Sequence, residues 1–196
     1  MSNSDIALRE RILAEGARLF MEHGYNGISM REIAEAVGVS KAGLYYHFND
    51  KQDLFLAIMH GALDATGQIV RQAAGAGPDV GAQLGALVRG LAGQPADQRA
   101  LVRLAGNEIA HLGPEARAGF GQRYQAQFIG PITAMLASGM ARGELRPADP
   151  PTLTWLLLGM LYPFLTTTPA GGARTPDTAI DALLELFLHG AAADRR

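Results

Sequence analysis

The 196-residue sequence contains no cysteine and no long apolar run. Without cysteine the chain has no disulfide bonds and no thiolate metal sites, and a reducing compartment is its natural setting. The longest apolar run, residues 153–165, contains a threonine, a glycine and a proline, and it is too short to span a bilayer. The first ten residues, MSNSDIALRE, include no apolar segment of a secretion signal. We therefore expect a cytoplasmic protein.

Excess positive charge is also missing. The formal net charge is −2, and residues 1–60 carry six basic and eight acidic side chains, so any surface for a polyanion must be local. Only two lysines occur, Lys41 and Lys51, and both flank one short segment, SKAGLYYHF at residues 40–48. A sequence biased towards arginine, alanine and glycine could place two lysines there by chance. Hydrophobic residues make up 48% of the chain, which is ample for a packed core.

The hydrophobic pattern predicts an all-α fold. Apolar residues recur with helical spacing, and no stretch alternates with the period of a strand. The predicted helices cover residues 4–24, 29–38, 40–48, 50–73, 79–93, 96–112, 114–142, 149–168 and 176–192. The segment AGAGP at residues 74–78 interrupts this pattern. We assign residues 1–50 to a DNA-binding domain and residues 51–196 to a larger helical domain for ligand binding and dimerisation.

Two capped helices near the N-terminus predict a helix-turn-helix. Ser29, with Glu32 three residues later, forms a capping box, and Gly38 ends the short helix that follows. Ser40 caps the next helix after a turn of about four residues. Leu44 and the phenylalanine at position 48 lie on the inner side of that helix. Small and hydrogen-bonding residues occupy the other side and its flanks: Ala42, Gly43, Tyr45, Tyr46 and His47.

This outer surface suits the DNA major groove. Small side chains at a helix N-terminus let the backbone approach base edges, while tyrosine hydroxyls and histidine on the flanks reach phosphates. The starts at Ser29 and Ser40 supply N–H groups and hydroxyls, and Arg31 can reach a guanine edge or a phosphate. Lys41 and Lys51 add positive charge beside them. The alternative is that the two tyrosines are core aromatics, but adjacent residues point about 100° apart on a helix. A wholly buried pair is therefore not expected.

Residues 24–55, GYNGISMREIAEAVGVSKAGLYYHFNDKQDLF, resemble the TetR family of bacterial one-component regulators. The segments IAEAVGVS, LYYHF and DKQDLF carry the resemblance, together with the glycine before the Ser-capped helix. It implies an all-helical dimer whose C-terminal domain binds an effector that weakens DNA binding. The DNA contacts implied by position are Arg31, Lys41, Ala42, Gly43, Tyr45, Tyr46, His47 and Lys51, with Ser29 and Ser40 at the helix starts. Gly43 is a departure, because many members carry a phosphate-binding threonine or serine there.

The C-terminal two-thirds contains no catalytic constellation, so we expect neither an enzyme nor a cofactor. Glu108 and His111 form one Glu-x-x-His, but di-iron bundles need two copies and further carboxylates, and we expect no metal site. Aromatic residues at helical spacing are core residues by default. They could instead line a mainly apolar ligand pocket with a few polar groups. The candidates for such a pocket are Asn107, His111, Tyr124, Phe128, Trp155 and Tyr162.

The last two predicted helices leave almost no polar face. A helix that is apolar all round must be covered on all sides, and one chain of this size has too few elements to cover both. A second copy is the economical solution, with Leu184 and Leu188 expected at the seam. The leading hypothesis is an effector-released, dimeric repressor that binds a pseudo-palindromic operator in double-stranded DNA. The alternatives are an effector-independent DNA-architectural protein and an all-α small-molecule carrier.

Overall fold

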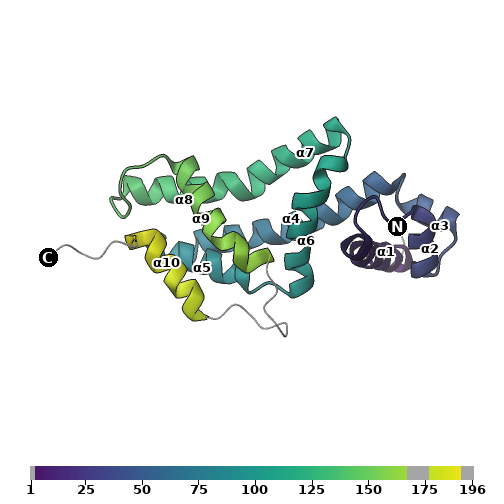
Figure 1. Ribbon diagram of the computed structural model, residues 1–196, viewed down its shortest axis with the longest axis horizontal. Helices are drawn as coiled ribbons and strands as arrows, with labels where there is room; N and C mark the ends of the chain where they lie inside the picture. The colour runs from purple at the N-terminus through teal and green to yellow at the C-terminus, as the bar shows by residue number, and fades with distance from the viewer. Residues whose placement is uncertain (1–2, 167–176, 191–196) are drawn as a thin grey trace. The chain divides into compact units, whose positions relative to one another are not determined.

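The computed structural model describes residues 3–166 and 177–190, and in these residues every regular element is a helix (Figure 1). The all-α prediction is confirmed. The elements are α1 (Asn3–His23), α2 (Met30–Val37), α3 (Lys41–His47), α4 (Lys51–Ala74), α5 (Val80–Ala92), α6 (Ala96–Glu108), the 3-10 helix η1 (Ile109–His111), α7 (Pro114–Tyr124), the π-helical turn η2 (Gln125–Ile129), α8 (Gly130–Ala141), α9 (Pro150–Thr166) and α10 (Asp177–His189). Within the described residues, no helix is both long enough and apolar enough to cross a membrane.

Packing divides the chain into two compact units. The N-terminal unit comprises Met1–Leu63 and Ala100–Gln122, and the C-terminal unit comprises Asp64–Arg99 and Arg123–Arg196. The predicted domain boundary after residue 50 stays a prediction about function. The packing divides the chain differently, because residues 51–63 and 100–122 pack with the helix-turn-helix.

The N-terminal unit is built on one aromatic and aliphatic core. The rings of Phe20 and Phe55 meet edge to face with centroids 5.3 Å apart, and the ring of Tyr25 meets Phe55 at 5.0 Å. The same cluster includes residues from α1, α2, α3, α4 and α6: Ile12, Ile33, Leu44, Phe48, Leu54, Leu101 and Leu104. Full burial of each such side chain is worth about 1.5–3 kcal/mol. The core thereby fixes α2 and α3, which lie side by side in Figure 1.

The C-terminal unit packs α5, α8, α9 and α10 around a second core. Its fully or nearly fully buried residues include Leu84, Leu87, Ile132, Leu136, Leu157, Leu161, Ile180 and Leu183. One polar contact lies inside it: the hydroxyls of Thr133 and Thr154 are 2.9 Å apart. Each hydroxyl is also a donor to the backbone carbonyl four residues earlier. Arg89 on α5 bonds Asp181 on α10 over 2.7 Å. The first contact links the consecutive helices α8 and α9, and the second links two helices that are distant in sequence.

The helix predicted over residues 114–142 is continuous from Pro114 to Ala141, but its middle is a π-helical turn in place of α-helix. Helix α7 ends at Tyr124, and a π-helical turn joins it to α8, with the amide of Gly130 bonded to the carbonyl of Gln125. Pro131 follows directly. Proline has no N–H to donate, and its ring clashes with the carbonyl four residues earlier. The wider π turn accommodates that missing bond without ending the helix.

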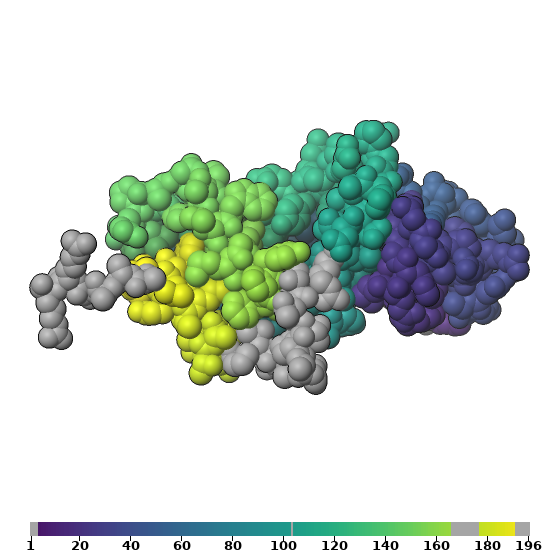
Figure 2. All heavy atoms as spheres, in the orientation of Figure 1, coloured from purple at the N-terminus to yellow at the C-terminus, as the bar shows by residue number. Residues whose placement is uncertain are grey.

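Helix α9 has one buried side and one exposed apolar side. Thr154, Leu157 and Leu161 are completely buried. Trp155, Leu156 and Tyr162 are more than half exposed, and Leu186 on α10 is also exposed. Helices α9 and α10 are neighbours on the surface of this unit (Figure 2). The expectation that Leu184 faces a partner is wrong, because Leu184 is only 8% exposed and packs towards α5, whereas Leu188 is half-buried. Residues 167, 168, 176, 191 and 192 of the predicted helices lie outside the described part.

Candidate nucleic-acid interface

The start of α2 is fixed by the predicted capping box. The hydroxyl oxygen of Ser29 accepts the amide N–H of Glu32, and the carboxylate of Glu32 accepts the amide N–H of Ser29 over 2.8 Å. Gly38 ends the helix with φ +77°, a left-handed conformation that glycine adopts without strain. The chain therefore turns sharply between α2 and α3, as a helix-turn-helix requires.

Helix α3 turns one side to the core and the other to solvent. The side-chain oxygen of Ser40 accepts the amide N–H of Gly43 over 3.0 Å and caps the helix. Leu44 and Phe48 are buried, as predicted. Tyr46 is 75% exposed, and Tyr45, Lys41 and Ala42 are exposed as well. Gly43 and His47 are half-buried. The outward-facing set thus combines small residues with hydrogen-bonding rings.

The two capping serines differ in whether the hydroxyl proton is already engaged in a hydrogen bond within the chain. The hydroxyl of Ser29 donates to Glu32 over 2.6 Å, so its proton is already engaged. The pKa of Glu32 is lowered, first by this side-chain bond and then by the backbone bond from Ser29. At Ser40 the oxygen accepts a bond, and its hydroxyl proton remains available to a phosphate. Ser40 is therefore better placed than Ser29 to donate to DNA.

Lys51 is more constrained than the sequence suggests. Its ammonium nitrogen lies 4.7 Å from the centroid of the Tyr25 ring, a cation–π arrangement. Desolvation lowers the pKa of Lys51, and burial also raises the pKa of Tyr25. Lys41, in contrast, is exposed, with its nitrogen 5.7 Å from the Tyr45 ring centroid. The two lysines at the ends of the segment thus have unequal environments.

Four residues make contacts across the N-terminal unit that no sequence pattern predicts. Arg11 donates from Nη2 to the carbonyl of Val37 over 2.8 Å at the end of α2, where a cation is favoured. Glu108 accepts the amide N–H of Tyr25 over 3.1 Å. The side-chain oxygen of Gln52 accepts the amide N–H of Gly113 over 3.0 Å. The fourth, Arg9, stacks over Phe48 at 5.0 Å. Each contact joins residues far apart in sequence, so no local pattern signals it.

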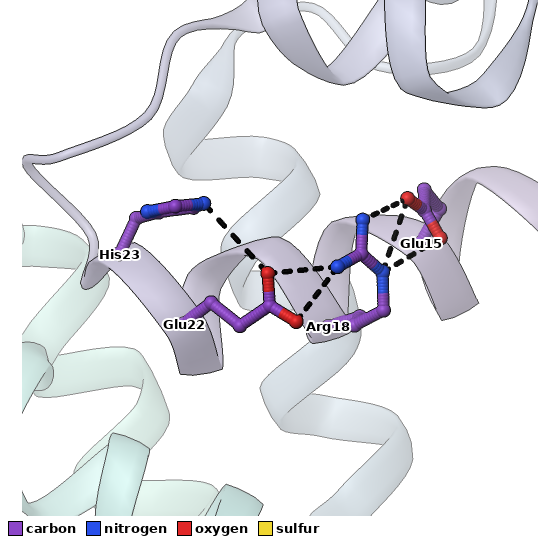
Figure 3. A network of polar contacts seen from close by, with 4 residues as sticks. All are labelled: Glu15, Arg18, Glu22 and His23. Carbon is purple, nitrogen blue, oxygen red and sulfur yellow. Dashed lines mark hydrogen bonds and ion pairs between the residues drawn. The ribbon is translucent and has the colours of Figure 1, made fainter.

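The surface of α1 carries charges that neutralise one another (Figure 3). Arg18 bonds the carboxylate of Glu22 over 2.7 Å and also that of Glu15, and His23 lies 3.7 Å from Glu22. The bond from Arg18 lowers the pKa of Glu15, and the pKa of Arg18 is raised by the bonds to Glu15 and Glu22. The donors of Arg18 are therefore engaged within α1, and this arginine adds little to a phosphate-binding surface.

The six candidate ligand residues are divided between the two units. Asn107 and His111 lie in the N-terminal unit and are exposed, with His111 3.9 Å from Glu108. The other four lie in the C-terminal unit. Tyr124 and Phe128 meet with ring centroids 5.3 Å apart, and burial raises the pKa of Tyr124. Trp155 and Tyr162 lie on the exposed side of α9.

Two protein-family models match most of the chain. The family model for bacterial regulatory proteins of the tetR family matches residues 12–58, and the model for the tetracyclin repressor-like C-terminal domain matches residues 77–191. The chain belongs to the TetR family. All predicted DNA contacts, from Ser29 to Lys51, lie in the first match, and all six ligand candidates lie in the second.

Other TetR-family proteins resemble this chain over part or all of its length. The repressor AcnR of Corynebacterium diphtheriae is 44% identical over 59 residues, which cover 30% of this chain and 31% of AcnR, so this likeness spans under a third of that relative. The repressor KstR2 of Rhodococcus jostii is 27% identical over 94% of this chain and 91% of KstR2.

Two solved structures share the whole fold. PfmR of Thermus thermophilus superposes with a TM-score of 0.82 and 28% identity, covering 93% of this chain and 100% of PfmR. AibR, solved in complex with isovaleryl coenzyme A and operator DNA, has a TM-score of 0.79 and 27% identity, covering 92% of this chain and 98% of AibR. The all-helical TetR architecture is thereby established for this protein.

Proposed function

We propose that this TetR-family protein is a dimeric transcriptional repressor that binds operator DNA through α2 and α3 and is released by a small, mainly hydrophobic ligand. The observation that carries the proposal is the outer side of α3. This side combines a capped helix start with the small residues Ala42 and Gly43 and the exposed rings of Tyr45 and Tyr46.

This surface suits the major groove for steric and electrostatic reasons. Ala42 and Gly43 have no bulk to hold the helix away from base edges. In the proposed complex, Lys41 and the hydroxyl of Ser40 bind phosphate, and the exposed Tyr46 contacts a second phosphate or a base. Arg31, in the first turn of α2, is the residue best suited to recognise guanine.

The relatives support DNA and a small molecule as the two partner classes. AcnR and KstR2 are repressors, and KstR2 resembles this chain over nearly its whole length. AibR binds operator DNA and isovaleryl coenzyme A with the same overall fold. An acyl coenzyme A thioester is therefore a sensible member of any ligand set tested on this chain.

Within the C-terminal unit, the π-helical turn is the best-supported place for a ligand. Gln127 Oε1 and Arg123 Nε are buried there without a hydrogen-bond partner in the described residues. Unsatisfied buried polar atoms call for an explanation, and a ligand with a polar group next to an apolar body would supply their partners. Tyr124 directly precedes this turn, Phe128 lies within it, and both remain proposed ligand contacts.

The exposed apolar side of α9 supports dimerisation. Trp155, Leu156, Tyr162 and Leu186 lie exposed on two neighbouring helices of one chain. Several large apolar side chains exposed on two helices that pack together favour an interface, and a second copy brings the same side chains. A two-fold dimer would present two α3 helices to half-sites about one DNA turn, or a multiple, apart.

One experiment tests the whole proposal. DNA sequences retained by the protein are selected from a random pool, and the selection is repeated with hydrophobic metabolites and, separately, with acyl coenzyme A thioesters. We expect a pseudo-palindromic sequence to be enriched and one class of ligand to abolish the enrichment. Retention without any enriched sequence would support the DNA-architectural alternative, and no retention at all would contradict DNA binding.

A further inference from the structure

The exposed face of α2 carries an ion pair that the proposed DNA contacts do not explain. Nε of Arg31 donates a hydrogen bond to Oε1 of Glu35, one turn later, over 2.8 Å. The side chain of Arg31 is 79% exposed and that of Glu35 is 61% exposed. Exposed pairs of this kind contribute little to folding stability. Stability therefore gives little reason to place a carboxylate on a surface that meets a polyanion.

The bond to Glu35 determines which edge of Arg31 remains open. Arginine recognises guanine by directing two N–H groups at O6 and N7. A guanidinium offers two such edges: one pairs Nε with an Nη, and the other consists of both Nη atoms. Glu35 engages Nε and so closes the first edge. In the described part of the chain, no partner is found for Nη1 or Nη2, so the terminal edge is open.

Glu35 also changes the charge that Arg31 presents. The other carboxylate on this helix surface, Glu32, is engaged by the amide and hydroxyl of Ser29. Glu35 is therefore the acidic group that directly offsets Arg31. A lone arginine attracts every phosphate and strengthens binding to all sequences alike. An arginine paired with a carboxylate gains less from phosphate but keeps its hydrogen-bonding geometry for a base edge.

We propose that Glu35 is a positioning residue for sequence specificity: it holds Arg31 end-on for two-point contact with guanine and weakens the attraction of Arg31 to phosphate. This inference rests on the proposed function, since it requires α2 to lie against DNA. It assigns the carboxylate a role in discrimination between sequences, at the cost of weaker binding to all DNA.

Three variants separate the two effects of Glu35. Glu35→Ala removes both the acceptor and the charge, whereas Glu35→Gln removes the charge and keeps an oxygen that can accept from Nε. Glu115→Gln removes another exposed carboxylate, on α7 outside the helix-turn-helix, and is the control. Selection from random DNA with the wild type and with Arg31→Ala first identifies the base pair whose preference depends on Arg31. Dissociation constants are then measured for the operator, for the operator altered at that base pair, and for unrelated DNA.

Glu35→Ala is expected to reduce discrimination at that one base pair by about 3- to 10-fold, part of the discrimination that a two-point arginine contact provides. It should also tighten binding to unrelated DNA. Glu35→Gln should tighten unrelated binding while keeping most of the discrimination. In the Arg31→Ala background, adding Glu35→Ala should not change the discrimination at that base pair any further. Circular dichroism should show unchanged helix content for every variant.

Several results would overturn this inference while leaving the proposed function intact. They are unchanged discrimination in Glu35→Ala, an equal change for all DNA sequences, or an Arg31→Ala protein that loses no base preference. A wild type that selects no sequence would overturn the proposed function as well. The two failures are thus distinguished by whether the wild type has an operator.

Discussion

Two side chains of α3 have different roles: one packs in the core, and the other is proposed to contact DNA. Leu44 is completely buried, and Tyr46, two positions later, is the most exposed large apolar residue found in the described chain. Successive residues on a helix point about 100° apart, so Leu44 and Tyr46 point in nearly opposite directions. One short helix can therefore pack against the core on one side and face the DNA groove on the other. Single substitutions should separate these two roles.

Tyr46→Ala should weaken operator binding and leave thermal stability almost unchanged, because the ring has few contacts to lose. Leu44→Ala should destabilise the protein by about 2–5 kcal/mol, as truncation of a buried leucine does. Gel-shift titration and thermal unfolding of both variants check this pair. Unfolding caused by Tyr46→Ala would mean that its ring is buried in solution.

Lys41→Ala should weaken binding to every DNA sequence similarly and lower the slope of log affinity against log salt by about one unit, because one phosphate contact is lost. Lys51→Ala should change the slope in the same way and also cost about 0.5–1 kcal/mol of stability, since the contact with the Tyr25 ring disappears. Binding measured at several salt concentrations is the test. A slope that does not move for either lysine would exclude that lysine from the interface.

At the scale of elements, the helix-turn-helix is held by contacts from outside its own sequence. Leu101 and Leu104 of α6 join its core, and Glu108 at the end of α6 accepts the amide N–H before α2. The side chain of Glu108 is only 19% exposed. An amide that loses its acceptor in such a place remains unsatisfied or must find water.

Glu108→Ala should therefore destabilise the N-terminal unit by about 1–3 kcal/mol, the cost of leaving a partly buried donor unsatisfied. Glu108→Gln keeps an acceptor oxygen and should recover much of this loss. His111→Ala is the control, because His111 is exposed and its replacement should change stability by less than about 0.5 kcal/mol. Urea unfolding of the three variants measures the difference. Equal stability of Glu108→Ala and wild type would show that the bond to Tyr25 contributes nothing.

At the scale of the whole molecule, the proposed dimer depends on which side chains α9 and α10 expose. Sequence alone favours Leu184 and Leu188 as seam residues, but Leu184 packs inside its own unit. The exposed apolar positions are Trp155, Leu156 and Tyr162 on α9 and Leu186 on α10. These side chains, rather than Leu184, are the ones available to a second copy.

Replacing Trp155 and Leu186 with glutamate should convert the dimer to a monomer that retains most of its helix content. Burial of an unpaired charge at an interface costs several kcal/mol. The monomer should also lose operator affinity, because one half-site is contacted alone. Leu184→Glu, in contrast, should unfold the C-terminal unit. Sedimentation at micromolar concentration and circular dichroism distinguish these results, and a double variant that stays dimeric would place the seam elsewhere.

What the sequence determined by itself is local. The caps at Ser29 and Ser40, the turn at Gly38 and the inward direction of Leu44 each depend on residues within about four positions, and the structure confirms them. The π turn before Pro131 also has a local cause, because the proline inside this helix cannot donate a backbone hydrogen bond.

Only the tertiary structure decided which surfaces meet. The bond between Glu108 and Tyr25 joins residues 83 positions apart, and the buried state of Leu184 depends on where α5 lies. Helical periodicity identifies an apolar face, but it does not say which neighbour covers that face. On a helix as apolar as α9, both sides look alike in sequence. Packing against the rest of the chain buries Leu157 and leaves Trp155 exposed.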